Sequence, residues 1–196
     1  MSKKQLRQED LEVQKLTKDN LHLIVGFVSS VCVELEAFLK ENAWNESCLD
    51  FSKTYLFLHK GTLAGYATLL TDKQTLANGT EPLLPFQEKA EYSSIPALKI
   101  GRLCVADNYN SQLQASQYSG LGKIIFASIL DHAQDLKTKV GCRVITTHAK
   151  KATGAHIWYK KLGFLYSHND EKVKESLAKE NVDAVPMFYD INRIIK

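Results

Sequence analysis

The sequence predicts one mixed α/β domain, and three observations point to that class. The chain of 196 residues is long enough for one domain with a sizeable core and too short for two. Hydrophobic residues make up 44% and charged residues 24% of it, close to ordinary globular usage. Strand-like and helix-like spacings of apolar residues also alternate along the chain, in the order β-α-β-β-β-α-β-α-β-(α)-β.

The first half of the chain predicts a strand, a helical region and a hairpin. Alternating apolar and polar residues mark the strand, and apolar residues at three- and four-residue steps mark the helical region. Gly26 and Ser29-Ser30 are the expected break in that region. The expected elements are a strand at 11–16, a helical region from 17 to 39, and hairpin strands at 54–59 and 63–70 around a glycine turn. The polar residues 1–10 are expected to form a flexible N-terminus, with the single domain over 11–196.

The second half predicts alternating strands and helices after a long polar connection at 72–95. A connection of that length is usually either mobile or functional. The expected elements are a strand at 97–107, a helix at 123–136, a strand at 143–148, a short helix at 153–162, a strand start at 164–167, an added charged helix at 170–183 and a last strand at 186–192.

Several classes of protein are not indicated by the sequence. No apolar run approaches the roughly 20 residues of a membrane-spanning helix, and the N-terminus lacks the apolar region of a signal peptide. We therefore expect a cytoplasmic protein that does not bind a membrane. The scattered cysteines contain no C-x-x-C pair, which predicts free thiols and no metal site; they are Cys32, Cys48, Cys104 and Cys142.

The formal net charge is only +3, but basic residues gather between residues 137 and 161 with no carboxylate among them. They are Lys137, Lys139, Arg143, Lys150, Lys151, Lys160 and Lys161. A local excess of positive charge attracts phosphates, and it is equally typical of a solvated helix and strand end. Both interpretations stay open from the sequence.

A glycine turn from Gln117 to Gly122 lies between an expected strand and an expected helix. The N–H groups at a helix N-terminus are unpaired, and glycines let a phosphate approach them closely. The Rossmann pattern does not fit because no third glycine follows at the right spacing. The P-loop pattern does not fit either, because Ile124 stands where it needs Ser or Thr.

This turn resembles the acyl-CoA loop of the GNAT superfamily of N-acetyltransferases, in which Gln or Arg is followed after two residues by Gly-x-Gly or Gly-x-Ala. Gln117, Gly120 and Gly122 fit that pattern. The strand at 100–105 and the stretch from Ala155 to Phe164, which fits A-x-x-x-Y-x-x-x-G-F, extend the resemblance over nearly the whole domain. It implies a mostly antiparallel six- to seven-stranded sheet, splayed at its central strands and flanked by helices.

The resemblance also implies that acetyl-CoA is the cofactor and that an acceptor amine attacks its thioester directly. Main-chain groups of the strand before the loop would contact the pantetheine arm, and the N–H of Val105 would hold the thioester oxygen. The cofactor-binding residues that it implies are Leu103, Cys104, Val105, Gln117, Ser119, Gly120, Leu121, Gly122 and Lys123.

Two catalytic residues follow from the same resemblance. Tyr159 would be the general acid that protonates the departing thiolate, and core packing is the alternative role for its ring. His148, at the end of an expected strand, would be the base for the amine. A lone histidine is more often structural, and Asp107 and Arg102 on the neighbouring strand are alternatives.

Within the superfamily, the sequence is similar to toxins that acetylate the amino acid carried by charged tRNA. They share a Gly-Arg-Leu-Ala-Val-Asp strand. This chain has Cys104 in place of the alanine, and Ala106 stands between Val105 and Asp107. Gln117 follows Val105 by twelve positions, about twice the usual spacing, so residues 108–116 are an insertion. The acceptor alternatives are a small-molecule or protein amine and aminoacyl-tRNA, and the contrasting class is a non-catalytic acyl-CoA-binding module. A homodimer is compatible with all of them.

Overall fold

The computed structural model describes residues 3–75, 92–167, 175, 178–179 and 183–192. The chain divides into two compact units, each made from two stretches of sequence. The first unit comprises residues 1–70 and 101–129, and the second comprises 71–100 and 130–196. Three long elements contribute to both units: strands β4 (Thr62–Thr75) and β5 (Ser94–Val105) and helix α3 (Leu121–Lys139).

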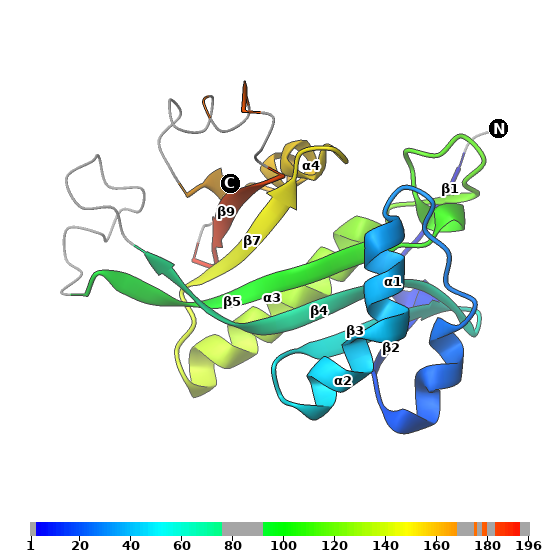
Figure 1. Ribbon diagram of the computed structural model, residues 1–196, viewed down its shortest axis with the longest axis horizontal. Coiled ribbons are helices and arrows are strands. Elements are labelled where there is room, and N and C mark those ends of the chain that lie inside the picture. The colour runs from blue at the N-terminus through cyan, green and yellow to red at the C-terminus, as the bar shows by residue number, and fades with distance from the viewer. Residues whose placement is uncertain (1–2, 76–91, 168–174, 176–177, 180–182, 193–196) are drawn as a thin grey trace. The chain divides into compact units, whose positions relative to one another are not determined.

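The main sheet has seven strands in the order β2-β3-β4-β5-β7-β9-β8, as Figure 1 shows for the larger strands. The remaining strands are β2 (Leu11–Lys15), β3 (Lys53–His59), β7 (Val144–Lys150), β8 (Leu165–Tyr166) and β9 (Ala184–Asp190). β5 and β7 are parallel, whereas β2–β3, β3–β4, β7–β9 and β8–β9 are antiparallel. The predicted mixed, mostly antiparallel sheet is confirmed.

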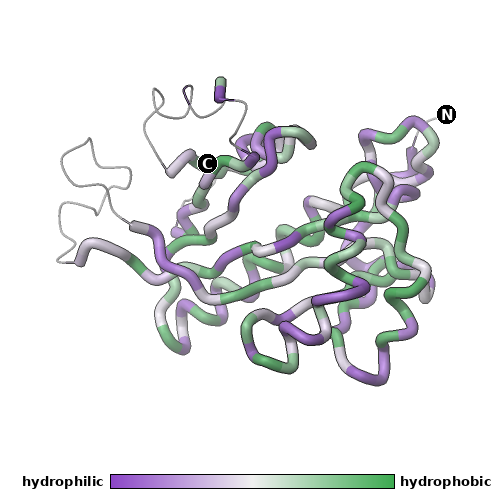
Figure 2. The backbone as a smooth tube through the Cα atoms, viewed as in Figure 1, coloured by the Kyte–Doolittle hydropathy of each residue, from purple (hydrophilic) through white to green (hydrophobic). Residues whose placement is uncertain are grey.

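In the first unit, helices α1 (Val33–Glu41) and α2 (Ala43–Cys48) cover one face of the strands. Figure 2 shows polar and apolar residues alternating along α1, as expected for a helix with one buried face. That face contributes Phe38 and Leu39 to a core with Leu56 of β3 and Tyr66 of β4. The hydroxyl of Tyr66 is buried and donates a hydrogen bond of 2.6 Å to the main-chain oxygen of Leu35, which satisfies the one polar atom of this ring.

The predicted helical region is broken, as expected near Gly26. A 3₁₀ helix, η2 (Lys18–Ile24), comes first, and α1 begins only at Val33. Residues 25–32 between them are irregular. The second break, at Asn42, and helix α2 were not predicted.

The first unit also contains a two-stranded parallel pair that the sequence did not predict. β1 (Lys4–Gln5) pairs with β6 (Tyr118–Ser119), and a 3₁₀ helix, η1 (Gln8–Asp10), follows. Within the segment 1–10, for which a flexible N-terminus was expected, Lys4–Gln5 and Gln8–Asp10 are in regular structure. Strands of two residues carry no measurable periodicity, so sequence patterning could not reveal this pair.

In the second unit, α4 (Ala155–Lys161) packs against β7. Within the sheet, β7 lies between β5 and β9. The core here is formed by fully buried residues of β7 and β9 together with Phe164; they include Val144, Ile145, Met187, Phe188 and Tyr189. The predicted charged helix at 170–183 lies mostly outside the described residues.

Gly65 of β4 lets α3 approach the sheet closely within the first unit. A Cβ at this position would lie 2.9 Å from the main-chain oxygen of Cys104 and 3.0 Å from Cδ1 of Ile125. Leu121, the first residue of α3, is fully buried and also faces this position, at 3.2 Å. The absence of a side chain at Gly65 therefore leaves room for Leu121 and Ile125 of α3 against β4.

We expect Gly65→Ala to lower the free energy of unfolding by about 1 to 3 kcal/mol, the usual cost of overpacking. Chemical denaturation measures this change. Gly26→Ala is the matched control, because a Cβ at Gly26 meets no atom within 4 Å. The control should stay within about 1 kcal/mol of the parent. Equal stability of both variants would contradict the close approach described here.

Candidate functional site

The turn that leads into α3 is built around Gly120. Gly120 has φ 91°, in the left-handed region that favours glycine, and its carbonyl oxygen accepts the N–H groups of Lys123 and Ile124 at 3.0 and 3.3 Å. In the part of the chain that the structure describes, the N–H groups of Gly120, Leu121 and Gly122 have no hydrogen-bond partner. Unpaired N–H groups at the start of a 19-residue helix favour an anion.

The other predicted cofactor residues of this turn differ in exposure. The side chain of Lys123 is exposed, so its ammonium group is available beside the turn. Leu121 is fully buried and anchors the helix in the core. Gln117 is exposed, and its main-chain N–H donates to the oxygen of Asn108 at 3.1 Å. The main chain of Gln117 therefore has a structural role, and its side chain faces solvent.

The strand before the turn has one buried and two half-buried residues at the predicted positions. Leu103 and Val105 are half-buried, whereas Cys104 is 4% exposed. The thiol of Cys104 donates to Oγ of Ser29 at 3.3 Å. Contact with the Cys32 thiol and burial raise the pKa of Cys104, so this thiol stays protonated and is unsuited to nucleophilic catalysis.

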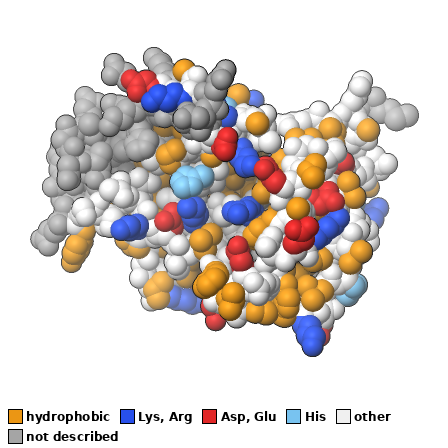
Figure 3. Space-filling view, viewed as in Figure 1, with side chains coloured by type: hydrophobic (Ala, Val, Ile, Leu, Met, Phe, Trp, Pro, Cys, Tyr) orange, Lys and Arg blue, Asp and Glu red, His pale blue; other side chains and the backbone are white. Residues whose placement is uncertain are grey.

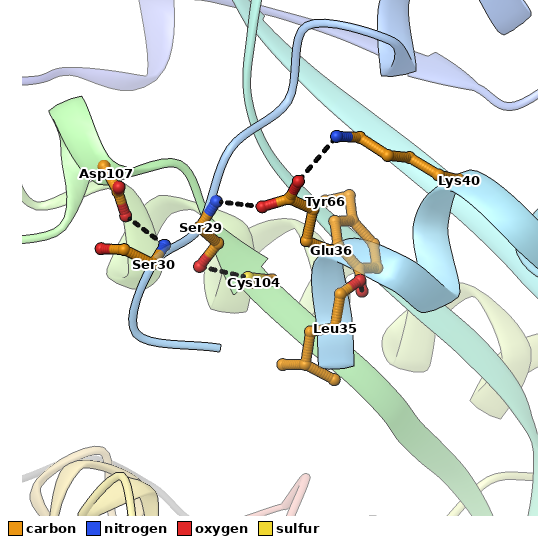
Figure 4. A network of polar contacts seen from close by, with 8 residues as sticks. All are labelled: Ser29, Ser30, Leu35, Glu36, Lys40, Tyr66, Cys104 and Asp107. Atoms are coloured by element: carbon orange, nitrogen blue, oxygen red, sulfur yellow. Dashed lines mark hydrogen bonds and ion pairs between the residues drawn. The ribbon is translucent and has the colours of Figure 1, made fainter. Parts of the chain in front are cut away.

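A network of polar contacts fastens the irregular segment 25–32 to the end of β5, and Figure 4 shows its members. The N–H of Ser30 donates to Oδ1 of Asp107 at 2.8 Å, and the N–H of Asp107 donates to the oxygen of Val28 at 3.0 Å. Asp107 thus holds this segment with both its main chain and its carboxylate. These bonds give Asp107 a structural role, and its alternative role as a base stays a prediction.

Glu36 of α1 fastens the same segment from the other side. Its carboxylate accepts the N–H of Ser29 at 2.8 Å and pairs with Lys40 at 2.6 Å. The hydrogen bonds from Lys40 and from the Ser29 N–H lower the pKa of Glu36.

Arg102, the other alternative, stacks on an aromatic ring of the first unit. Its guanidinium carbon lies 4.6 Å from the centre of the Phe38 ring, and Nη1 donates to the oxygen of Gly101 at 2.8 Å. A guanidinium group stays protonated at neutral pH and cannot accept a proton. Arg102 is therefore unsuitable as a base.

Tyr159 of α4 is buried in the second unit, where its ring contacts Trp158 and Phe164 edge-on. Burial raises the pKa of Tyr159 to about 12, and a hydrogen bond with Thr147 of β7 opposes this shift. Thr147 in turn donates to the oxygen of Ile100 at 3.3 Å, at the last register pair of the parallel β5–β7 ladder. The phenol of Tyr159 thus lies near the point where this pairing ends, and it stays protonated at neutral pH.

His148 lies in an open pocket of about 390 Å³ in the second unit. The end of β4 contributes Asp72, β5 contributes Lys99, and β7 contributes Thr146 and His148. Oδ2 of Asp72 accepts the Thr146 hydroxyl at 2.7 Å and lies 3.8 Å from Nζ of Lys99. Partial burial and the positive charge of Lys99 lower the pKa of His148, while Asp72 opposes the shift, so the neutral imidazole predominates at pH 7.

The sequence did not predict Asp72, Lys99 and Thr146 at this pocket. Each stands alone in its strand, and no short motif contains them. Only the sheet order β4-β5-β7 brings them together. Asp72 fell in the expected connection at 72–95, because β4 continues to Thr75, beyond the expected strand end at residue 70.

The basic stretch from 137 to 161 is partly neutralised. Arg143 pairs with Asp190 at 2.9 Å, and Lys139 pairs with Asp135 at 2.7 Å. Lys160 and Lys161, in the last turn of α4, are exposed. On the face seen in Figure 3, basic side chains are interspersed with acidic ones, which matches the low net charge. The positive charge that remains is therefore local.

Neither a membrane-spanning helix nor a metal-binding cluster is present among the described residues. No helix there is long and apolar enough to cross a bilayer. No group of three or more His, Cys, Asp or Glu side chains there is placed to hold a metal ion. All four cysteines are free thiols.

We expect Lys99→Met to raise the pKa of His148, because the variant removes a positive charge that disfavours the imidazolium. Asp72→Asn should lower the pKa further, since it removes the opposing carboxylate. NMR titration of the His148 ring protons measures both changes. His132 is the internal control, because its neighbouring charges are Asp131 and Asp135. An unchanged His148 pKa in both variants would show that the charges of Lys99 and Asp72 do not affect its ring.

No family model matches the chain, and no curated protein matches it. Solved structures do match. A tyrosine-to-phenylalanine mutant of KacT is 21% identical, with a TM-score of 0.69 over 93% of this chain and 95% of that chain. AtaT complexed with acetyl-methionyl-tRNAfMet is 22% identical, with a TM-score of 0.69 over 92% and 95%.

A third structure is a tyrosine-to-phenylalanine mutant of the AtaT toxin bound to acetyl-CoA and to the C-terminus of the antitoxin AtaR. It is 20% identical, with a TM-score of 0.64 over 93% of this chain and 94% of that chain. Structural similarity at these sequence identities shows only that the fold is shared. The chain therefore has the GNAT fold, in the form that KacT and AtaT share.

Proposed function

We propose that this protein is an acetyl-CoA-dependent N-acetyltransferase. The observation that carries the proposal is the turn at Gly120–Gly122, whose unpaired N–H groups begin α3 in a chain with the fold of AtaT. One AtaT structure holds acetyl-CoA. Pyrophosphate is an anion that such a helix N-terminus binds well, and the exposed Lys123 beside it adds a cation.

The strand before the turn binds the rest of the cofactor in this proposal. Main-chain groups of Leu103, Cys104 and Val105 contact the pantetheine arm, so their side chains matter less. The N–H of Val105 donates to the thioester oxygen as negative charge develops on it. In the turn itself, Gln117 and Ser119 support the main chain that holds the pyrophosphate.

Two side chains move the protons of the reaction. The acceptor amine gives up a proton to the neutral imidazole of His148, and its nitrogen forms a bond to the acetyl carbon. The carbon–sulfur bond breaks, and the departing thiolate takes a proton from the Tyr159 hydroxyl. The products are the N-acetylated amine and the thiol of coenzyme A, and the proton taken up by His148 returns through solvent to the Tyr159 phenolate. Because burial keeps the phenol of Tyr159 protonated, it has a proton to give at neutral pH.

The acceptor that we favour is the amino group of aminoacyl-tRNA, a cytoplasmic molecule. AtaT, whose fold this chain shares, has been solved with acetyl-methionyl-tRNAfMet. The exposed Lys160 and Lys161 and the half-buried Lys150 and Lys151 provide cations for tRNA phosphates. A small-molecule or protein amine is the alternative acceptor, and it has no need of these lysines.

We expect Tyr159→Phe to lower kcat by roughly 10²- to 10⁴-fold, the usual span for a positioned acid, with acetyl-CoA binding nearly unchanged. The ring and its packing remain, while the proton is lost. The assay is acetyl transfer, with calorimetry for binding and a thermal melt for stability. Full activity in a folded variant would remove Tyr159 from the mechanism. Loss of both stability and cofactor binding would instead favour the packing role.

If charged tRNA is the acceptor, Lys160→Glu with Lys161→Glu should weaken acetylation and reduce its dependence on salt. Each lost phosphate contact lowers the slope of log affinity against log salt by about 0.7 to 0.9. The assay incubates the protein with acetyl-CoA and total charged tRNA and detects acetylated aminoacyl ends.

Lys15→Glu with Lys18→Glu is the control for that experiment, because it changes the net charge equally at two exposed lysines of the first unit. It should leave acetylation nearly unchanged. No acetylated product from any amino acid would exclude tRNA as the acceptor. Equal effects of the two double variants would show that only the net charge matters.

A further inference from the structure

The N-terminal strand runs directly along the cofactor turn. The N–H of Lys4 donates to the oxygen of Gln117 at 2.9 Å, and the N–H of Leu6 donates to the oxygen of Ser119 at 3.0 Å. Leu6 is 3% exposed, so its side chain fixes the strand in the first unit. The residue between these two anchors is Gln5.

The insertion at 108–116 is tied to the same strand. Nζ of Lys3 donates to the main-chain oxygens of Ser111 and Leu113, both at 2.7 Å. The N–H of Gln117 donates to the main-chain oxygen of Asn108 and so joins the two ends of the insertion. The insertion, whose role the sequence left open, thus forms one assembly with the N-terminal strand and the turn.

Aromatic contacts hold this assembly on β3. Nδ1 of His59 lies 3.0 Å from the hydroxyl of Tyr109, inside a buried cluster. The ring of Tyr109 stacks on that of Tyr118 with the centroids 5.0 Å apart and the planes 15° from parallel. The main chain on both sides of Gln5 therefore has a fixed place.

The side-chain amide of Gln5 has a defined direction. Its Oε1 accepts the hydroxyl of Ser119 at 3.2 Å in an exposed contact, which leaves Nε2 as the donor of this amide. A Cβ at Gly120 would lie 2.4 Å from Nε2, 3.2 Å from Cδ and 3.6 Å from Oε1. Because a carbon–carbon bond measures about 1.5 Å, Nε2 lies within about 4 Å of the Gly120 Cα. Among the described residues, Nε2 has no acceptor.

We propose that the Nε2 amide of Gln5 is a further hydrogen-bond donor to the pyrophosphate of acetyl-CoA, beside the N–H groups of Gly120, Leu121 and Gly122. The proposal rests on the proposed function, since it assigns a ligand contact at the same turn. Gly120 then has two reasons to be glycine: its positive φ and the amide that lies over its Cα. Ser119 contributes by orienting this amide.

The sharpest test is Gln5→Glu, which keeps an oxygen for the Ser119 hydroxyl and replaces the donor with a negatively charged acceptor. Gln5→Met removes the donor at similar volume. We expect Gln5→Met to weaken acetyl-CoA binding about tenfold, as for a lost hydrogen bond to a charged group, and Gln5→Glu to weaken it more. Gln5→Lys should restore binding, because it supplies a donor again. Calorimetry with acetyl-CoA gives each Kd, and thermal melts test folding.

Gln8→Glu is the control, because it introduces the same charge at an exposed residue three positions further on. It should bind acetyl-CoA within about twofold of the parent, as expected for screened surface charges. Parent-like affinity in Gln5→Met and Gln5→Glu would overturn the proposal. Tighter binding in Gln5→Met would also overturn it, by showing that the amide obstructs the turn. Failure of Gln5→Lys to improve on Gln5→Met would reduce Gln5 to a packing role.

The same titrations separate this proposal from the proposed function. If the parent protein does not bind acetyl-CoA, the proposed function fails and the Gln5 contact with it. If the parent binds acetyl-CoA and the Gln5 variants match it, only the Gln5 contact fails.

Discussion

The conformation of Gly120 is the constraint on which the cofactor turn depends. A positive φ at this one residue lets the chain leave β6 and enter α3 within a single position, so that the first N–H groups of the helix stay unpaired. Leu121, the first residue of the helix, is buried against Gly65, which stabilises this start. Two glycines of different elements thus determine the position and the direction of one helix N-terminus.

The sequence predicted the elements whose apolar spacing is long and regular, and it predicted their order. The β3–β4 hairpin, α3 and β7 lie close to the expected ranges because each buries a continuous face, although β4 continues to Thr75, into the expected connection at 72–95. β1 and β6 were not predicted, since a two-residue strand has no period. Helix α2 was missed because six residues are under two turns.

The site could be predicted only where a local motif carries it. The glycine turn and Tyr159 belong to such motifs, and their catalytic and binding roles stay predictions. Asp72 and Lys99 lie beside His148 only because of the sheet order. Gln5 lies beside Gly120 although the two residues are far apart in the sequence, so no local pattern contains either set. Asp107 was a candidate base by position, and its hydrogen bonds to residues 28–30 became visible only in the fold.

The pairing of β1 with β6 has a consequence for the order of folding. Gln5 and Ser119 are 114 positions apart. Closing so long a loop costs conformational entropy that the hydrogen bonds of two paired residues offset only in part. We therefore expect the strand to dock after the core of the first unit has formed and to open without global unfolding. Amide hydrogens of Lys4 and Leu6 should then exchange with solvent faster than those in the middle of β3. Any molecule that binds the docked form shifts this local equilibrium toward closure, by mass action alone.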